Sequence, residues 1–85
     1  MFYVYILRLN NGQLYTGFTA DLKRRIQEHT NKKVTSTSKR HPVKLIHYEA
    51  YLVETDARRR ERFLKSSEGK SLLKRQIRDL LEKLV

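Results

Sequence analysis

Two tyrosines, an arginine, a histidine and a glutamate stand out in this sequence by their chemistry: Tyr5, Tyr15, Arg25, His29 and Glu61. An arginine can hold a phosphate group through two parallel hydrogen bonds. A histidine one helical turn further along can carry a proton near neutral pH. A glutamate is a hard oxygen ligand that suits Mg²⁺. Hydrolysis of a phosphodiester bond needs such groups, because it requires an activated water and stabilisation of the phosphorus centre and the leaving oxyanion.

The two tyrosines depend on their surroundings to act as bases. A free tyrosine has a pKa of about 10. Arg25, other cations and a metal ion nearby would favour the phenolate, so we expect a lowered tyrosine pKa at such a site. Each residue also has a structural interpretation. A tyrosine can be a strand residue with one polar end, His29 a surface residue, and Glu61 the ion-pair partner of Arg58 or Arg60.

Residues 2–9 and 14–19 are rich in aromatic and β-branched residues and predict two strands. Asn11-Gly12 between them is a strong signal for a hairpin. A two-residue loop at Asn11-Gly12 would put Tyr5 and Tyr15 on opposite faces of the sheet.

A three-residue loop over residues 10–12 has the opposite consequence. With Gly12 in the left-handed conformation, Tyr5 would pair with Gly17, and Tyr15 would lie on the same face as Tyr5. Gly17 would then leave space opposite the Tyr5 ring. The residues alone leave both registers open, and only the second allows the two tyrosines to act together.

A helix is predicted over residues 20–31, with Thr19 as its N-cap. Its apolar stripe would face the sheet, while Arg25 and His29 share a second stripe. Residues 32–42 combine cations with hydroxyls and lack apolar periodicity, which predicts a loop. That loop would be either a mobile linker or an arm that contacts phosphates.

The remainder of the chain predicts a third strand over residues 44–52, a helix over 55–66 and an amphipathic closing helix over 71–84. Gly69 would break the chain between the two helices. The inward stripe of the first of these helices carries a carboxylate at its centre: Ala57, Glu61 and Leu64. A functional role for Glu61 would explain this anomaly.

The 85 residues predict one domain over 1–85, because a chain of this length has room for one core. Cysteine is absent, which suits a reducing compartment. The N-terminal apolar run MFYVYIL is much shorter than the roughly 20 residues of a membrane helix. We therefore expect a cytoplasmic protein without a membrane segment.

The charge indicates a polyanionic partner. Nineteen Lys and Arg face nine acids, a formal net charge of +10, and the cations form a block between Lys23 and Lys44 in which Glu28 is the one acid. Such a block implicates nucleic acid, although a solubilising surface is the simpler interpretation. The predicted nucleic-acid contacts are Lys23, Arg24, Lys32, Lys33, Lys39 and Arg40.

Taken together, these residues resemble the GIY-YIG nucleases. The first family motif appears as Tyr3-Val4-Tyr5, with Tyr3 in place of the opening glycine, and the second as Tyr15-Thr16-Gly17. In that family an arginine and a histidine four residues later follow on a helix, as Arg25 and His29 do here. A later helix supplies the metal-binding glutamate, a position that Glu61 matches. The resemblance covers nearly the whole chain and is closest to small stand-alone members.

The resemblance implies an α/β (α+β) domain, in which a three-stranded antiparallel sheet is flanked by helices. It also implies hydrolysis at a single metal site, with Mg²⁺ or Mn²⁺ held by Glu61. Arg25 would stabilise the phosphate, one of Tyr5 and Tyr15 would activate water, and His29 would assist proton transfer or contact phosphate. Because both tyrosines then line one site, the resemblance favours the three-residue hairpin loop.

The function implied is a metal-dependent endonuclease that acts on DNA rather than RNA in repair or recombination. Many family members gain specificity from an attached DNA-binding domain. Here affinity would come mainly from cations on phosphates, would be weakly sequence-selective and would fall steeply with salt. A protein partner could supply specificity, and the sequence leaves the oligomeric state open. The alternative is a nucleic-acid-binding module on the same fold with little or no cleavage.

Overall fold

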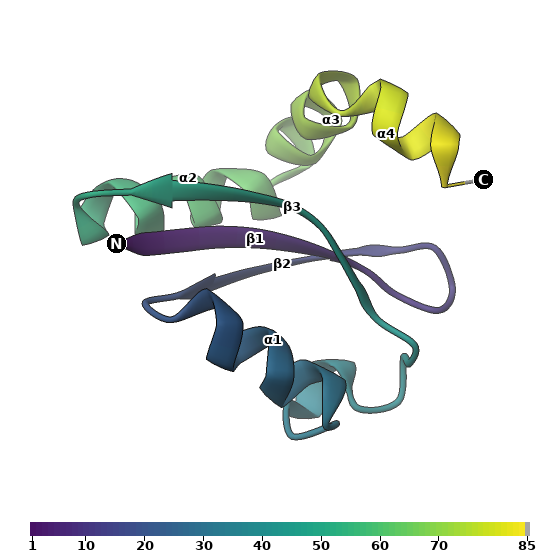
Figure 1. Ribbon diagram of the computed structural model, residues 1–85. Helices are drawn as coiled ribbons and strands as arrows, with labels where there is room; N and C mark the ends of the chain where they lie inside the picture. Colours follow the sequence, from purple (N-terminus) through teal and green to yellow (C-terminus); the bar gives the residue numbers. More distant parts are fainter. Residues whose placement is uncertain (85) are drawn as a thin grey trace.

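The computed structural model of the protein describes residues 1–84, in which helices pack on both sides of a small sheet (Figure 1). The order of elements is β1 (Phe2–Arg8), β2 (Leu14–Thr19), α1 (Leu22–Thr30), a short 3₁₀ helix η1 (Thr35–Thr37), β3 (Lys44–Tyr51), α2 (Glu54–Lys65), α3 (Ser67–Gln76) and α4 (Arg78–Lys83). The predicted α+β class is confirmed, and every strand lies within one residue of its predicted bounds. No helix within residues 1–84 is both long and apolar enough to cross a bilayer.

The sheet confirms the register of the three-residue loop. β1 lies in the middle, with β2 and β3 antiparallel on either side. Tyr5 pairs with Gly17 and Leu7 with Tyr15, and Gly12 adopts the positive φ of 84° that this loop requires. Because side chains alternate along a strand, both tyrosines lie on the same face of the sheet.

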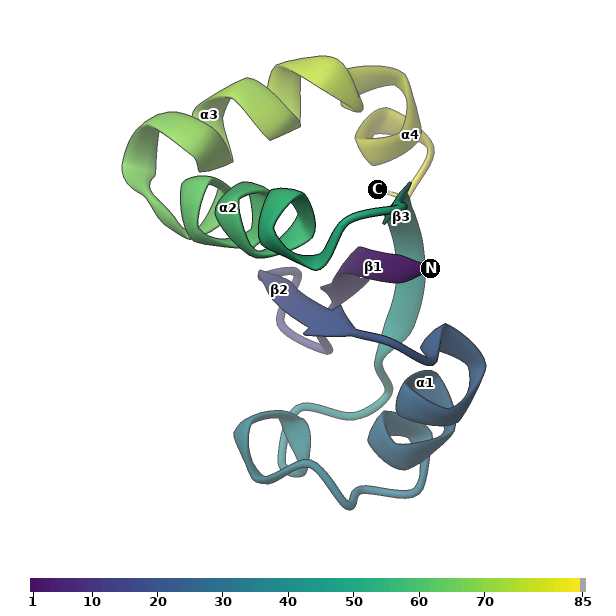
Figure 2. The same cartoon turned by 90° about the vertical axis from the view of Figure 1, so that its left-hand side faces the viewer.

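The two faces of the sheet are covered by different parts of the chain. Figures 1 and 2 show α2, α3 and α4 on one face and α1 with the following loop on the other. On β1, Val4 and Ile6 point toward α2 and Tyr5 points toward α1. The buried apolar core lies on the α2 face and consists of Val4, Ile6, Ala57, Leu64, Leu73 and Ile77. Outside this cluster Tyr5, Leu7, Leu9 and Val34 are buried as well, together with the polar side chains of His29 and Thr37.

Helix α1 is capped by Asp21, so the prediction of Thr19 as N-cap is wrong. The Asp21 side chain accepts a hydrogen bond from the backbone N–H of Arg24 at 3.1 Å. The Thr19 hydroxyl instead accepts from the N–H of Asp21 at 3.0 Å and donates to its carbonyl at 3.1 Å. Thr19 therefore stabilises the turn before the helix, and the capping role passes to the acid two residues later.

Two predictions for the C-terminal helices are also wrong. The chain breaks at Ser66 (ψ 161°), whose hydroxyl caps α3 by accepting from the N–H of Gly69 at 3.1 Å. Gly69 lies inside α3, where a Cβ would collide with the carbonyl of Phe63. The helix predicted over 71–84 is divided at Ile77 (φ −109°, ψ 28°). The break turns α4 so that its apolar side chains also reach the core.

The loop predicted over residues 32–42 contains η1 and is attached to its neighbours. Val34 and Thr37 are buried. The backbone N–H of Asn10, at the hairpin, donates to the carbonyl of Arg40 at 2.9 Å, and the Asn10 side chain donates to the carbonyl of His41 at 3.0 Å. These contacts hold the loop beside the hairpin.

Candidate active site

The hydroxyl of Tyr5 lies between two side chains of α1. It is 2.8 Å from Nε2 of His29, and Nε of Arg25 donates to it at 3.4 Å. Tyr5 and His29 are both fully buried, at 1% and 0% exposure. Since residues four apart on a helix lie on one face, α1 presents Arg25 and His29 to the same tyrosine. The structure thus brings these three predicted site residues together.

The hydrogen-bond partners of His29 favour one tautomer. Nδ1 of His29 is 2.7 Å from Oγ1 of Thr37, and the Thr37 hydroxyl donates to the carbonyl of Val34 at 3.5 Å. Because that hydroxyl proton is directed at the carbonyl, Thr37 accepts the hydrogen bond from Nδ1–H. Nε2 then carries the lone pair and accepts from the hydroxyl of Tyr5.

Burial controls the titration of this pair. Burial, followed by the positive charge of Arg25, lowers the pKa of His29 to about 4, so His29 is neutral at pH 7. Burial also raises the pKa of Tyr5, although the hydrogen bond from Arg25 acts in the opposite direction. The expected lowering of the tyrosine pKa is therefore wrong for Tyr5 in the protein by itself. Desolvation of the phenolate outweighs the nearby guanidinium.

Tyr15 lies beside the pair on the same face of the sheet. Its ring centroid is 6.4 Å from that of Tyr5 and 5.4 Å from that of His29. The hydroxyl of Ser36, in η1, donates to the hydroxyl of Tyr15 at 3.2 Å. Gly17 completes the arrangement, because a Cβ at this position would overlap the Tyr5 ring. The ring of Tyr5 thus lies directly on β2.

Glu61 approaches from the other side of the sheet. Within residues 1–84 no hydrogen bond or ion pair joins it to the other four residues; its ion-pair partner is Lys65, at 3.0 Å. The alternative pairing with Arg58 or Arg60 is wrong, because these two bind other acids. The Glu61 side chain is 15% exposed, and its negative charge contributes to the raised pKa of Tyr5. The carboxylate therefore lies within electrostatic reach of the Tyr5 hydroxyl.

The chemistry of Glu61 fits one metal ion held jointly with a substrate. No group of three or more His, Cys, Asp or Glu side chains placed to hold a metal occurs in the described part of the chain. Mg²⁺ needs only one or two carboxylates, and completes its octahedron with waters and substrate phosphate oxygens. Glu61 offers one carboxylate whose ion-pair partner, Lys65, is 56% exposed and easily displaced.

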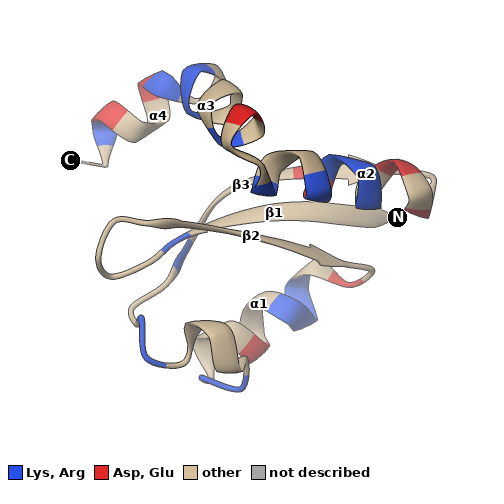
Figure 3. Ribbon diagram, turned by 180° about the vertical axis from the view of Figure 1, so that it is seen from behind, with Lys and Arg blue, Asp and Glu red and all other residues tan. Residues whose placement is uncertain are grey.

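The six predicted nucleic-acid contacts are all exposed, and none has an ion-pair partner within residues 1–84: Lys23, Arg24, Lys32, Lys33, Lys39 and Arg40. They lie on α1 and on the segment between α1 and β3. Figure 3 shows Lys and Arg on both of these segments. Their role in binding stays a prediction, but each ammonium or guanidinium group is free to meet a phosphate.

Three residues of the loop belong to the site and were not predicted individually. Thr37 orients His29, and Ser36 contacts Tyr15. Nε2 of His41 is buried and has no hydrogen-bond partner within residues 1–84, and the charge of His41 contributes to the lowered pKa of His29. The sequence feature that could have indicated these residues is the run of hydroxyl side chains in this loop. Which hydroxyl faces which ring depends on the packing of η1.

Comparison with known proteins identifies the family. The model of the GIY-YIG catalytic domain matches residues 1–76. The chain belongs to the GIY-YIG family. This places it in a family of nuclease-type domains, with Tyr5, Tyr15, Arg25 and His29 within the matched residues.

Similar proteins share most of this GIY-YIG domain. A UPF0213 protein of Pediococcus acidilactici is 40% identical over 76 residues, which cover 86% of this chain and 78% of the relative. A UPF0213 protein of Staphylococcus epidermidis is 37% identical over 73 residues, covering 85% and 89%. The solution NMR structure of a UPF0213 protein from Bacillus halodurans has a TM-score of 0.56 and 38% identity, covering 86% of this chain and 82% of that chain.

The neutral state of His29 makes the GIY-YIG domain sensitive to acid. Between pH 6.5 and about 4 the unfolded histidine binds a proton that the folded one does not, so the free energy of unfolding decreases as the pH falls. We expect a loss of about 2–3 kcal/mol over this window. Urea titrations of the wild type and His29→Asn at several pH values measure it. Parallel pH dependence in the two proteins would contradict the assignment.

Glu49 extends the acid sensitivity to lower pH. Burial by itself would raise the pKa of Glu49, but hydrogen bonds from Arg60, His47 and Tyr51 outweigh it and lower the pKa to about 2. Arg60 holds this carboxylate with two bonds, at 2.9 and 3.2 Å. The stabilisation is present above about pH 4.5 and is lost as the pH falls toward 2. The His29→Asn variant should keep this second decrease.

Proposed function

We propose that this GIY-YIG domain is an endonuclease that hydrolyses phosphodiester bonds in DNA with one Mg²⁺ or Mn²⁺ ion. The observation that carries the proposal is the hydroxyl of Tyr5, which contacts both Nε2 of His29 and Nε of Arg25. A buried tyrosine with an arginine on one side and a neutral imidazole acceptor on the other is equipped to transfer a proton beside a phosphate. A purely structural tyrosine would not need both.

Each side chain has a role that follows from its contacts. Arg25 uses Nε on Tyr5 and Nη1 on Glu28, and its side chain remains 36% exposed, so its other N–H groups can donate to a phosphate oxygen. His29 accepts the proton of Tyr5 through Nε2. The Tyr5 oxygen can then take a proton from the attacking water.

Glu61 would hold the metal ion at the edge of the site. When bound, the ion supplies Lewis-acid stabilisation of the phosphate and lowers the pKa of a bound water. Glu61 also distinguishes the proposal from the binding module, because a carboxylate among the cations repels phosphate unless a metal intervenes. A module that only binds nucleic acid would not need the Glu61 carboxylate.

The substrate contacts would come from cations rather than from base recognition. The exposed cations of α1 and the following loop can reach the backbone phosphates and provide affinity with little sequence selectivity. We therefore propose a role in repair or recombination, where the structure of the DNA rather than its sequence is recognised. A protein partner can supply further selectivity.

A nicking assay tests the function. Wild-type protein is incubated with supercoiled plasmid in Mg²⁺, in Mn²⁺ and in EDTA, and we expect nicked circles only with a divalent ion. Arg25→Ala should lower the rate by about 10²-fold, because it removes a donor to the developing phosphate charge. Arg24→Ala is the matched control: it removes the same charge from the neighbouring, exposed position, and should change the rate only a few-fold.

Two results would contradict the proposal. Equal loss in Arg24→Ala and Arg25→Ala would mean that Arg25 acts only as a surface cation. Salt-dependent binding to DNA without nicking of supercoiled, single-stranded or branched substrates would favour the binding module.

A further inference from the structure

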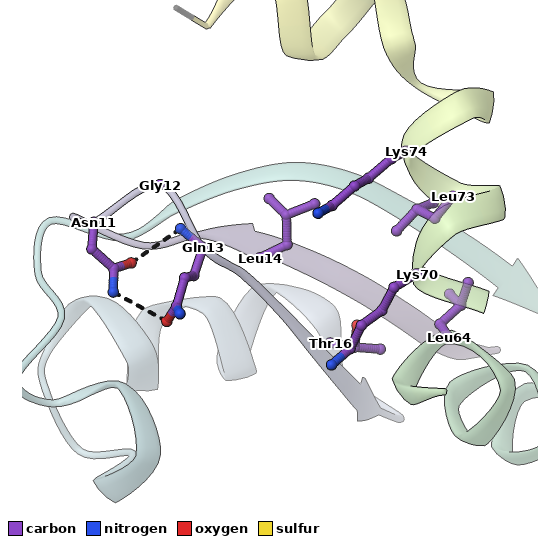
Figure 4. A pocket seen from close by; sticks show the side chains of 9 residues that line it. All are labelled: Asn11, Gly12, Gln13, Leu14, Thr16, Leu64, Lys70, Leu73 and Lys74. Carbon is purple, nitrogen blue, oxygen red and sulfur yellow. Dashed lines mark hydrogen bonds between the residues drawn. The ribbon is translucent and has the colours of Figure 1, made fainter. Parts of the chain in front are cut away.

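A groove of about 510 Å³ lies on the face of the sheet opposite the tyrosines, between the hairpin and α3. Figure 4 shows its residues: Asn11, Gly12, Gln13, Leu14, Thr16, Leu64, Lys70, Leu73 and Lys74. Buried leucines of α2 and α3 contribute to its apolar part, and the hairpin and two lysines supply the polar groups. Its volume falls within the range of about 300–1,000 Å³ that is typical of ligand sites.

The two lysines give the groove an uncompensated positive charge. Lys70 and Lys74 lie four residues apart on α3, therefore on one face, and both side chains extend toward β2 (Figure 4). Neither has an ion-pair partner within residues 1–84. In the part of the chain that the structure describes, no acidic residue lines the groove. Two unpaired ammonium groups over a partly apolar surface suit an anionic ligand with an uncharged body.

The tip of the hairpin, at one end of the groove, is an ordered turn. The amide of Asn11 donates to Oε1 of Gln13 at 3.1 Å, and its Oδ1 accepts from the backbone N–H of Gln13 at 3.0 Å. In Figure 4 the side chains of Asn11 and Gln13 point away from Lys70 and Lys74, so they stabilise the turn and leave the donors of the groove to other residues. The hydroxyl of Thr16 lines the groove, and hydroxyls commonly donate to phosphate oxygens.

The groove and the candidate active site share β2. Tyr15 points toward the active site, while its neighbours Leu14 and Thr16 point into the groove, because side chains alternate along the strand. β2 is an edge strand with β1 as its one neighbour in the sheet, so its outer edge presents unpaired backbone groups. The two sites therefore lie on opposite faces of the same edge strand.

We infer that the groove binds the sugar-phosphate backbone of a single nucleic-acid strand that continues from the active site around the edge of β2. Lys70 and Lys74 would contact its phosphates, and the leucines would contact its sugars. A straight duplex is too stiff to touch both faces of the sheet. The preferred substrate is therefore DNA with a single-stranded branch or flap. This inference rests on the proposed function for the location of the scissile bond.

The test compares two double variants that remove equal charge. Lys70→Ala/Lys74→Ala alters the groove, and Arg75→Ala/Arg78→Ala removes two exposed cations from neighbouring positions outside it. Binding to flap DNA and to linear duplex of equal length is measured by fluorescence anisotropy over a range of salt, in EDTA to prevent cleavage. For the groove variant we expect about a tenfold loss of affinity for the flap, and a slope of log K against log[salt] that is shallower by about 1.4, because two phosphate contacts are lost. Affinity for the duplex should change no more than in the control.

The outcomes separate this inference from the proposed function. Equal losses in the two double variants, or equal losses on flap and duplex, would overturn the role of the groove even if the wild type nicks DNA. Selective loss on the flap by a protein that cuts nothing would support the groove while overturning the nuclease. If the groove variant loses affinity for a poly-glutamate peptide but not for the flap, the ligand is an acidic peptide and the inference is wrong.

Discussion

Glu61→Gln should lower the rate of metal-dependent nicking by about 10³-fold or more, because it removes the one charged oxygen ligand proposed for the metal ion. The amide keeps the size of the side chain but binds Mg²⁺ poorly. The same change should strengthen DNA binding in EDTA, since it removes a negative charge that repels phosphate. A loss of cleavage together with a gain of metal-free binding is difficult to explain by misfolding.

The stability of the variant can be checked separately. Among the described residues Glu61 pairs only with the exposed Lys65, so the free energy of unfolding should change by less than about 1 kcal/mol. Glu54→Gln, two turns earlier on α2, is the matched control for charge and should cut DNA at nearly the wild-type rate. Equal cleavage by the wild type and Glu61→Gln would show that the metal assignment is wrong.

Tyr5→Phe should reduce the nicking rate by about 10³-fold, whereas Tyr15→Phe should reduce it by about tenfold or less. Only the hydroxyl of Tyr5 contacts both a proton acceptor, Nε2 of His29, and the guanidinium of Arg25. The hydroxyl of Tyr15 contacts Ser36, at an exposed position. We therefore expect Tyr5 to be the base. The reverse order of the two rates would assign that role to Tyr15.

The raised pKa of Tyr5 and the lowered pKa of His29 both disfavour a phenolate and an imidazolium in the protein by itself. Transfer of the proton from Tyr5 to Nε2 of His29 creates the two opposite charges side by side, and their attraction offsets part of this cost. Tyr5→Phe leaves Nε2 of His29 without a partner, which should destabilise the fold by about 1–2 kcal/mol. Urea titration of both tyrosine variants measures this cost, and activities should be compared where both are folded.

The sequence was sufficient for the main elements and the family. Strong β-type runs and an Asn11-Gly12 turn predicted the hairpin, and apolar spacing predicted the helices, because these signals are local. The helix ends were less predictable. Ser66 and Ile77 interrupt the C-terminal helices for reasons of packing, and Gly69 is a site of close approach rather than a break.

The residues of the candidate site were recognisable from type and spacing, but their contacts were not. The resemblance favoured the three-residue loop, and the pairing of Tyr5 with Gly17 confirms it. In the protein by itself the pKa of Tyr5 is raised, whereas a lowered pKa was expected beside cations and a metal ion, because burial depends on how β1, β2 and α1 pack together. The charge pattern suggested a tyrosine surrounded by cations, whereas in the folded protein Tyr5 is buried against His29.

The chain thus carries in its sequence the set of side chains and the order of elements that mark a GIY-YIG domain. Packing in three dimensions sets the rest: the hydrogen bond between Tyr5 and His29, the approach of Glu61 from the other face, and the groove beneath β2. These features join residues that are far apart in the chain, so no local pattern encodes them. They depend on the sheet, which has the candidate active site on one face and the groove on the other, with the edge strand β2 between them.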